Sequence, residues 1–131
     1  MTHLLDTSAF LIYYFGEPGS ARLTTLLGRQ DTSVALCAVS ATEFWARLKA
    51  EGFEDSFASE WTTYRKLFEL SAVNEQVALK ATELREAATQ RISTVDSLIA
   101  GCAALHNAVL LHRDPHFQSI PENLLKQEFI G

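Results

Sequence analysis

Four acidic residues, each placed where an apolar run or a capping signal gives way to a helix or loop, are the side chains of this sequence best suited to chemistry. They are Asp6, Glu43, Asp96 and Asp114. Gathered carboxylates repel one another and lose hydration, so they are unfavourable unless a cation or shared protons offset the charge. Hard oxygen ligands of this kind select Mg²⁺ or Mn²⁺. The pattern therefore predicts a metal site assembled from distant parts of the chain.

Each acid also has a purely structural interpretation. Ser40 and Glu43 have the spacing of a capping box, and Asp96 in a first helical turn would complement the helix dipole. Asp6 and Asp114 stand where a carboxylate can cap a helix or turn. Hydroxyl residues that can serve as caps already stand beside these acids, however, so helix stability does not require the added charge. We therefore favour a shared functional role for the four acids.

The substrate expected for such a site carries phosphate. Mg²⁺ keeps several waters, takes one or two carboxylates and completes its coordination with phosphate oxygens. Hydrolysis by a metal-activated water is the reaction this predicts, and it requires no nucleophilic side chain. Arg91 precedes the Asp96 segment and Arg113 stands beside Asp114, so both arginines are candidates for binding the phosphate.

Histidine and cysteine give weaker signals. His112 and His116 flank Asp114, but a spacing of two on a strand and loop is a poor signature for metal ligation. We expect these histidines at the surface or in support of the ligands. Cys37 and Cys102 stand in apolar segments, which predicts small core side chains rather than a disulfide framework or a zinc motif.

Composition limits the class of protein. The chain has 131 residues, of which 47% are hydrophobic and 21% charged, and a net charge of −5. This length fits one globular domain, predicted over residues 1–131. The apolar runs are much shorter than the roughly 18 residues of a membrane span, and we expect a soluble cytoplasmic protein with no membrane partner. The negative charge argues against general electrostatic binding of nucleic acid, so phosphate would have to be received locally.

The elements that must position the acids alternate between strand and helix. Apolar runs predict strands over residues 3–5, 34–39, 70–73, 108–111 and 124–130, the last at a sheet edge. Helices are predicted between them, with Gly16, Gly52 and Asn107 at three of their ends. Alternating strands and helices predict an α/β fold with a mostly parallel central sheet. Binding sites of such sheets lie outside the carboxyl ends of the strands, where all four acids can meet.

In order and spacing, four segments of the chain resemble those of the PIN-domain ribonucleases, and among them the compact VapC-like toxins of prokaryotic type II toxin–antitoxin pairs. The segments are Leu4-Leu5-Asp6-Thr7-Ser8, Ser40-Ala41-Thr42-Glu43-Phe44, Asp96-Ser97-Leu98-Ile99-Ala100 and Leu110-Leu111-His112-Arg113-Asp114-Pro115-His116-Phe117. The resemblance covers nearly the whole chain and implies a PIN-like three-layer α/β/α sandwich. The chain departs from the family pattern at His112, where a hydroxyl residue is common, and at His116, where an acid is common.

The resemblance implies an endoribonuclease whose four acids form a catalytic Mg²⁺ or Mn²⁺ site. Asp6 and Asp96 are the first candidates for direct ligands, and the Thr7 or Ser8 hydroxyl would support them by hydrogen bonds or through water. The resemblance also implies a homodimer and a cognate antitoxin that wraps the toxin and blocks the site with a basic side chain.

Aromatic residues in two segments are candidates for a surface that binds the antitoxin. Two segments carry them: Phe10, Tyr13 and Tyr14, and then Phe57, Trp61, Tyr64 and Phe68. They are numerous for one small core, so a groove that binds a helix and ordinary burial in the core are both open.

Two other functions stay open at this point. A phospho-acceptor or aspartyl-phosphate phosphatase domain also uses an acidic Mg²⁺ pocket, but it needs a lysine near the phosphoryl group. No lysine of this chain directly ends an apolar strand. The second alternative is a PIN-like binding module without catalytic activity.

Overall fold

Five parallel strands form one central sheet in the computed structural model, which describes all 131 residues. The strands are β1 (His3–Leu5), β2 (Val34–Cys37), β3 (Glu69–Ser71), β4 (Val109–His112) and β5 (Gln127–Phe129). Their order is β3-β2-β1-β4-β5, and each neighbouring pair is parallel. The predicted parallel sheet is therefore confirmed, although β2 and β5 are shorter than their apolar runs suggested.

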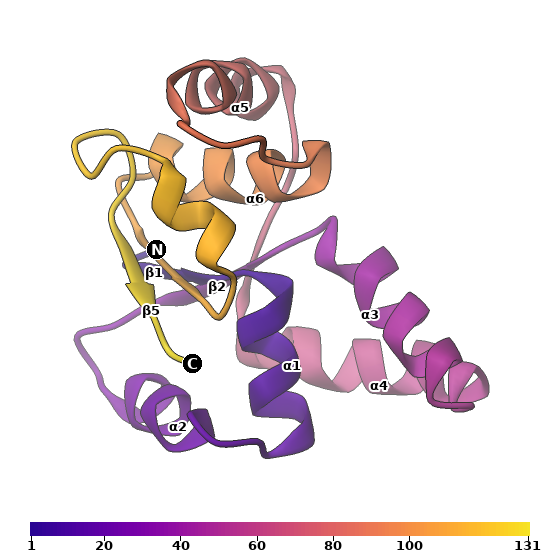
Figure 1. Cartoon of the computed structure of the whole chain (residues 1–131). Helices are drawn as coiled ribbons and strands as arrows, with labels where there is room; N and C mark the ends of the chain where they lie inside the picture. Colours follow the sequence, from indigo (N-terminus) through magenta and orange to yellow (C-terminus); the bar gives the residue numbers. More distant parts are fainter.

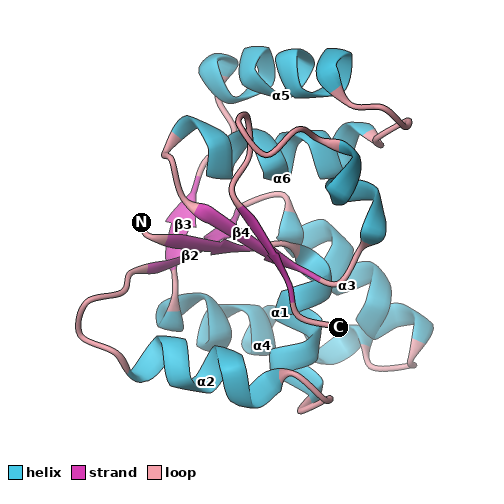
Figure 2. Ribbon diagram, turned by 60° about the vertical axis from the view of Figure 1, so that its left-hand side comes forward, coloured by secondary structure: helices cyan, strands magenta, loops and turns pink.

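Helices cover both faces of this sheet. The α-helices are α1 (Thr7–Phe15), α2 (Ser20–Gly28), α3 (Ser40–Ala50), α4 (Phe57–Tyr64), α5 (Glu75–Ala87) and α6 (Thr94–Leu105). Three 3₁₀ turns are η1 (Glu54–Ser56), η2 (Arg65–Leu67) and η3 (Pro115–Ser119). Helices α5 and α6 pack on one face and α1 to α4 on the other (Figure 2). This is the three-layer α/β/α sandwich that the sequence predicted.

Alternate residues of each central strand supply the two cores. Leu4 and Leu110 pack into the cluster shared with α5 and α6, whereas Leu5 and Leu111 pack against α1 to α4. All four side chains are buried. Successive side chains of a strand point to opposite faces, so a sheet covered on both sides needs continuously apolar strands. The free thiols of Cys37 and Cys102 are also buried, as predicted, with their sulfur atoms 3.5 Å apart.

The aromatic residues of α1 and α4 mainly pack on one another. Phe10 is fully buried, and its ring centroid lies 6.5 Å from that of Trp61, while the Tyr14 and Tyr64 centroids are 4.9 Å apart. Burial in the core therefore accounts for much of the aromatic content. Trp45 on α3 is 42% exposed, because Phe44, one position away on the helix, occupies the inner side.

The helical connections that lead to the two neighbours of β1 lie on opposite faces of the sheet, so the direction of the strand order reverses at β1. Strand β1 leads through α1 and α2 to β2 on one side (Figure 1), and the α5–α6 crossover brings β4 to its other side. Such a reversal leaves a crevice outside the carboxyl ends of the two adjacent strands. Each helix is too short or too polar to span a lipid bilayer.

Candidate metal and phosphate site

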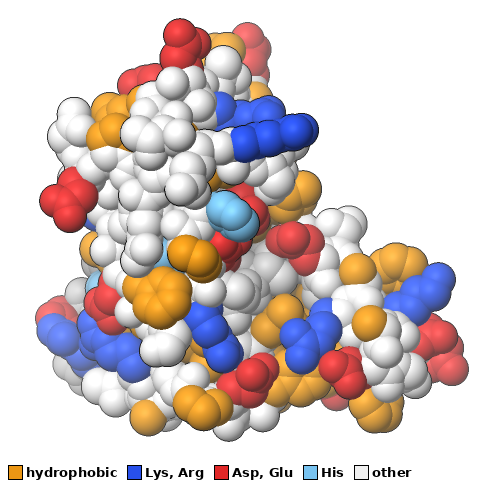
Figure 3. All heavy atoms as spheres, viewed as in Figure 1, with side chains coloured by type: hydrophobic (Ala, Val, Ile, Leu, Met, Phe, Trp, Pro, Cys, Tyr) orange, Lys and Arg blue, Asp and Glu red, His pale blue; other side chains and the backbone are white.

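The four acids selected from the sequence line one cavity at the carboxyl ends of β1 and β4. This cavity has a volume of about 330 Å³, and its lining consists of Asp6, Thr7, Ser8, Leu11, Glu43, Asp96 and Asp114. Figure 3 shows acidic side chains with a histidine beside them where the α5–α6 layer meets the lower layer. Folding therefore brings together carboxylates that are far apart in the chain.

Asp6 follows β1 directly and begins α1. Its backbone N–H donates to the carbonyl of Leu111 at 3.0 Å, which places it against the end of β4. Its Oδ1 accepts hydrogen bonds from the Ala9 N–H at 2.9 Å and the Ser8 hydroxyl at 2.6 Å. The capping interpretation is therefore correct, but it does not exhaust the residue. The side chain is only 3% exposed, and burial, together with the charge of Asp96, raises the pKa of Asp6 to about 7.

Glu43 is held by a threonine from another element. The capping-box interpretation is wrong, because the residue before α3 is Val39 and no side chain caps this helix. Instead, the hydroxyls of Thr7 and Ser40 lie 3.0 Å apart, and the Thr7 hydroxyl donates to the Glu43 carboxylate. Burial, and then the charge of Asp96, raises the pKa of Glu43. Its carboxylate is thereby fixed in the cavity rather than used at its own helix end.

Asp96 and Asp114 enter the cavity from the other layer. The N–H of Asp96 donates to the Ser93 hydroxyl at 3.1 Å, so a hydroxyl caps α6 as predicted. Burial, and then the charge of Asp114, raises the pKa of Asp96. Asp114 caps η3, and its Oδ1 lies 2.9 Å from both the N–H and the Nδ1 of His116.

His112 is buried behind Asp114 and not at the surface, whereas His116 is exposed. The Asp114 N–H donates to Nδ1 of His112 at 3.2 Å, which places the ring proton on Nε2, 2.8 Å from Oε1 of Gln127. The Gln127 amide in turn donates to the carbonyl of Phe117 at 2.9 Å. Burial lowers the pKa of His112, in keeping with a neutral ring. His112 thus holds the backbone N–H of Asp114 in place. Support of an acid of the site was one of the two roles expected for this histidine from the sequence.

The donor set fits a hard divalent ion. Three of its carboxyl groups have raised pKa values because of burial and mutual charge, and a cation would offset both penalties. No three histidine, cysteine, aspartate or glutamate side chains are close enough together to hold an ion jointly. An ion bound here would therefore take one or two carboxylates directly and keep water at its other positions, which is the coordination that Mg²⁺ commonly has.

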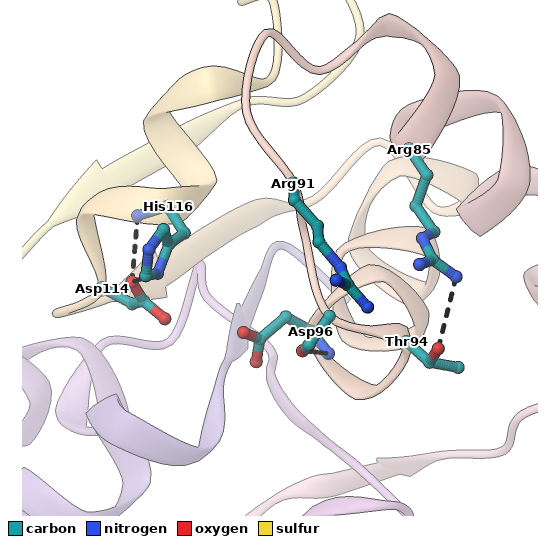
Figure 4. Close-up of a pocket in the computed structure, with 7 residues that line it drawn as sticks. Arg85, Arg91, Thr94, Asp96, Asp114 and His116 are labelled. Atoms are coloured by element: carbon teal, nitrogen blue, oxygen red, sulfur yellow. Dashed lines mark hydrogen bonds and ion pairs between the residues drawn. The ribbon is translucent and has the colours of Figure 1, made fainter.

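The two arginines predicted to bind substrate lie in different surroundings. The Arg113 guanidinium pairs with Glu17 at 3.4 Å in a neighbouring cavity, while its backbone N–H donates to the Ser8 hydroxyl at 2.9 Å. Arg91 lines a cavity of about 580 Å³ that adjoins the acids (Figure 4). Its lining consists of Arg85, Arg91, Ser93, Thr94, Asp96, Asp114 and His116.

Arg85 is a residue of this second cavity that the sequence interpretation missed. It stands in the last turns of α5, and no acid lies three or four positions from it. Arg22 lacks such an acid as well and still pairs with Glu128, so the sequence held no signal that separated Arg85 from the other arginines.

The chain belongs to the PIN domain family, because a PIN-domain family model matches residues 3–123. Its fold is similar to that of VapBC2 from Rickettsia felis bound to a promoter DNA fragment, with a TM-score of 0.80, 20% identity and 100% of both chains covered. DNA-bound VapBC from Salmonella typhimurium gives a TM-score of 0.80 at 15% identity, over 100% of this chain and 99% of the other. Mycobacterium tuberculosis VapC20, described as a sarcin-ricin loop cleaving toxin, gives 0.69 at 14% identity, over 90% and 94%. A comparison with curated protein sequences found no match.

Proposed function

We propose that this protein is a Mg²⁺- or Mn²⁺-dependent endoribonuclease of the VapC toxin type. The observation that carries the proposal is the convergence of Asp6, Glu43, Asp96 and Asp114 on one cavity, in a chain of the PIN domain family. The description of the similarly folded VapC20 as an RNA-cleaving toxin agrees with this choice. The proposed unit is a single domain over residues 1–131 that acts on RNA in the cytoplasm.

In this proposal, the carboxylates hold the ion, and neighbouring hydroxyls orient those carboxylates. Asp6 and Asp96 are the proposed direct ligands, and Glu43 and Asp114 bind directly or through water. The hydroxyl of Ser8 holds Asp6, and that of Thr7 holds Glu43, so each carboxylate keeps its orientation when the site is hydrated. When bound, a divalent ion lowers the pKa of a coordinated water and offsets charge on the reacting phosphate oxygens. Arg91, from the adjoining cavity, is the proposed contact for substrate phosphate, and a similar role for Arg113 stays a prediction.

A protein antitoxin is the proposed regulator, and a homodimer the proposed assembly. The similar solved structures include VapBC complexes, which supports a partner of this kind. The cavity is acidic and open to solvent, so a basic side chain of the partner would be attracted to it and would compete with the metal.

The test is RNA cleavage by purified protein freed of any antitoxin. We expect cleavage with Mg²⁺ or Mn²⁺ and none in EDTA, and we expect Asp6→Asn and Asp96→Asn each to abolish it. Asp55→Asn is the matched control, because Asp55 is an exposed aspartate of η1 outside both cavities. Circular dichroism should show all three variants folded. Undiminished cleavage by the Asp6 and Asp96 variants would refute the assignment.

A further inference from the structure

The arginine-lined cavity next to the acids contains a second arginine, Arg85, besides the proposed phosphate contact Arg91. Figure 4 shows Arg85 and Arg91 on one side, Asp114 and His116 on the other, and Asp96 between them. Arg85 comes from α5 and Arg91 from the segment between α5 and α6, so two elements supply the guanidinium groups. The cavity is lined without any hydrophobic residue.

Neither of these arginines is used in an ion pair. Four other arginines, Arg22, Arg29, Arg47 and Arg113, each pair with a carboxylate, and Arg65, which lies outside both cavities, does not. The Arg85 guanidinium makes one hydrogen bond, from Nη1 to the Thr94 hydroxyl at 3.3 Å, and the Arg91 guanidinium makes none. Two carboxylates line the same cavity, yet neither arginine pairs with them. The two cations are therefore available to an anion, and the fork of donors on each matches the oxygens of a phosphate.

The cavity adjoins the acid site. Asp96 and Asp114 line both the 330 Å³ and the 580 Å³ spaces, so these two residues form the boundary between them. An RNA strand whose reacting phosphate lies among the acids can cross this boundary and enter the arginine side. The chain as a whole carries a net charge of −5, so phosphate must be received locally, and the two unpaired arginines supply positive charge beside the acids.

We infer that Arg85 and Arg91 form a phosphate subsite for the nucleotide next to the scissile bond of a single-stranded RNA. The Thr94 hydroxyl orients Arg85, and its own backbone lies at the start of α6, where N–H groups also favour an anion. The inference rests on the proposed nuclease function and extends it, because it adds Arg85 to the contact proposed for Arg91 and assigns both to one phosphate. It gives the enzyme two points of contact along the strand, one through the metal site and one through the arginines.

The test measures RNA binding without cleavage. The Asp6→Asn protein is titrated with a fluorescein-labelled 12-nucleotide RNA of random sequence, in Mg²⁺ buffer, and anisotropy is followed. Adding Arg85→Ala or Arg91→Ala should weaken binding by about tenfold each, the loss expected for one charge-assisted contact. The slope of the logarithm of the binding constant against the logarithm of the salt concentration should become less negative by about 0.7 for each arginine removed, the value for one single-strand phosphate contact. Arg65→Ala is the matched control, because Arg65 is exposed, unpaired and part of η2, outside both cavities.

Cleavage kinetics provide the second readout. With Asp6 intact, the Arg85 and Arg91 variants should raise KM by about tenfold and change kcat little. Arg→Lys at either position should restore only part of the affinity, because lysine keeps the charge but not the bidentate geometry. Melting temperatures close to that of the parent protein would show that the exposed arginines are not needed for folding.

The outcomes separate this inference from the function on which it rests. If the wild-type protein cleaves RNA and the Arg85 and Arg91 variants bind and cleave like Arg65→Ala, the subsite is wrong and the nuclease assignment stands. If no RNA is cleaved but both variants lose RNA affinity and salt dependence, the subsite is supported and the nuclease assignment fails. If RNA affinity is unchanged but an acidic peptide such as poly-glutamate loses affinity in the variants, the cavity serves an acidic protein segment and the inference is overturned.

Discussion

Replacing Asp6 by asparagine should stabilise the metal-free protein, and the gain should grow with pH. Asp6 is 3% exposed and its pKa is raised to about 7 from an unfolded value of 3.8. The folded state therefore retains a proton that the unfolded chain loses, so its stability is greatest below pH 4 and declines as pH rises towards 7. The whole shift corresponds to about 4 kcal/mol at 1.36 kcal/mol per unit, and about 2.5 kcal/mol of it is lost between pH 5 and pH 8.

Asparagine isolates this contribution because it is neutral in both states and has nearly the same shape. Its side-chain oxygen can still accept the hydrogen bonds from Ser8 and the Ala9 N–H that cap α1. The advantage of asparagine over aspartate should therefore increase by about 2.5 kcal/mol from pH 5 to pH 8, which is a shift of about 1 M in the urea midpoint. Asp55→Asn, at an exposed aspartate, should show no such growth.

The assay is urea denaturation of both proteins at pH 5 and pH 8 in EDTA, followed by circular dichroism. Repeating it in Mg²⁺ should reduce the advantage of asparagine at pH 8, because an ion that binds only the folded carboxylates stabilises the aspartate protein. An advantage that is the same at both pH values would show that the Asp6 carboxyl is not destabilised by burial. A more stable aspartate protein at pH 8 in EDTA would refute the reasoning altogether.

Three further substitutions test how the site and its supporting layer are built. Thr7→Val removes the hydroxyl that donates to Glu43, and it should weaken Mg²⁺ binding, measured by calorimetry, by about tenfold. Gln127→Leu leaves Nε2 of the buried His112 without a partner, and it should cost about 1 to 3 kcal/mol in urea denaturation. Gly101→Ala places a Cβ 2.8 Å from a backbone oxygen of α5, and it should lower stability by about 1 to 3 kcal/mol in the same assay. Unchanged values in these measurements would contradict the corresponding contacts.

The sequence was sufficient where local signals and the general geometry of α/β folds agree. Apolar runs located β1, β2 and β4, and hydroxyl or amide side chains cap two of the helices between them, Asn74 at α5 and Ser93 at α6. Parallel strands place their carboxyl ends on one edge, so the meeting of the acids could be anticipated without knowing the order of the strands. The order itself depends on which face the α5–α6 crossover covers, which no local signal specifies.

The errors occurred where a contact distant in the chain overrode a local pattern. Ser40 and Glu43 have capping-box spacing, but Thr7, more than thirty positions earlier, bonds to both side chains. The burial of His112 depends on Gln127 in the neighbouring strand β5, which the spacing around Asp114 could not reveal. Local propensity therefore predicted the elements well, while the hydrogen bonds that orient the site are tertiary.

The acid site lies between two helical layers that pack into separate cores. Its carboxylates therefore line one cavity without being close enough together to hold one ion directly. Asp6 and Glu43 are fixed by hydroxyls of α1, within the layer whose core contains Phe10 and Phe44. Asp96 begins α6, whose apolar residues belong to the other core. A ligand that contacts both halves, such as a hydrated divalent ion, would balance the charge of all of them at once. If the site binds a divalent ion as proposed, an ion that keeps part of its water shell would fit it best, because the outer carboxylates could then bind through water without any movement of the two cores.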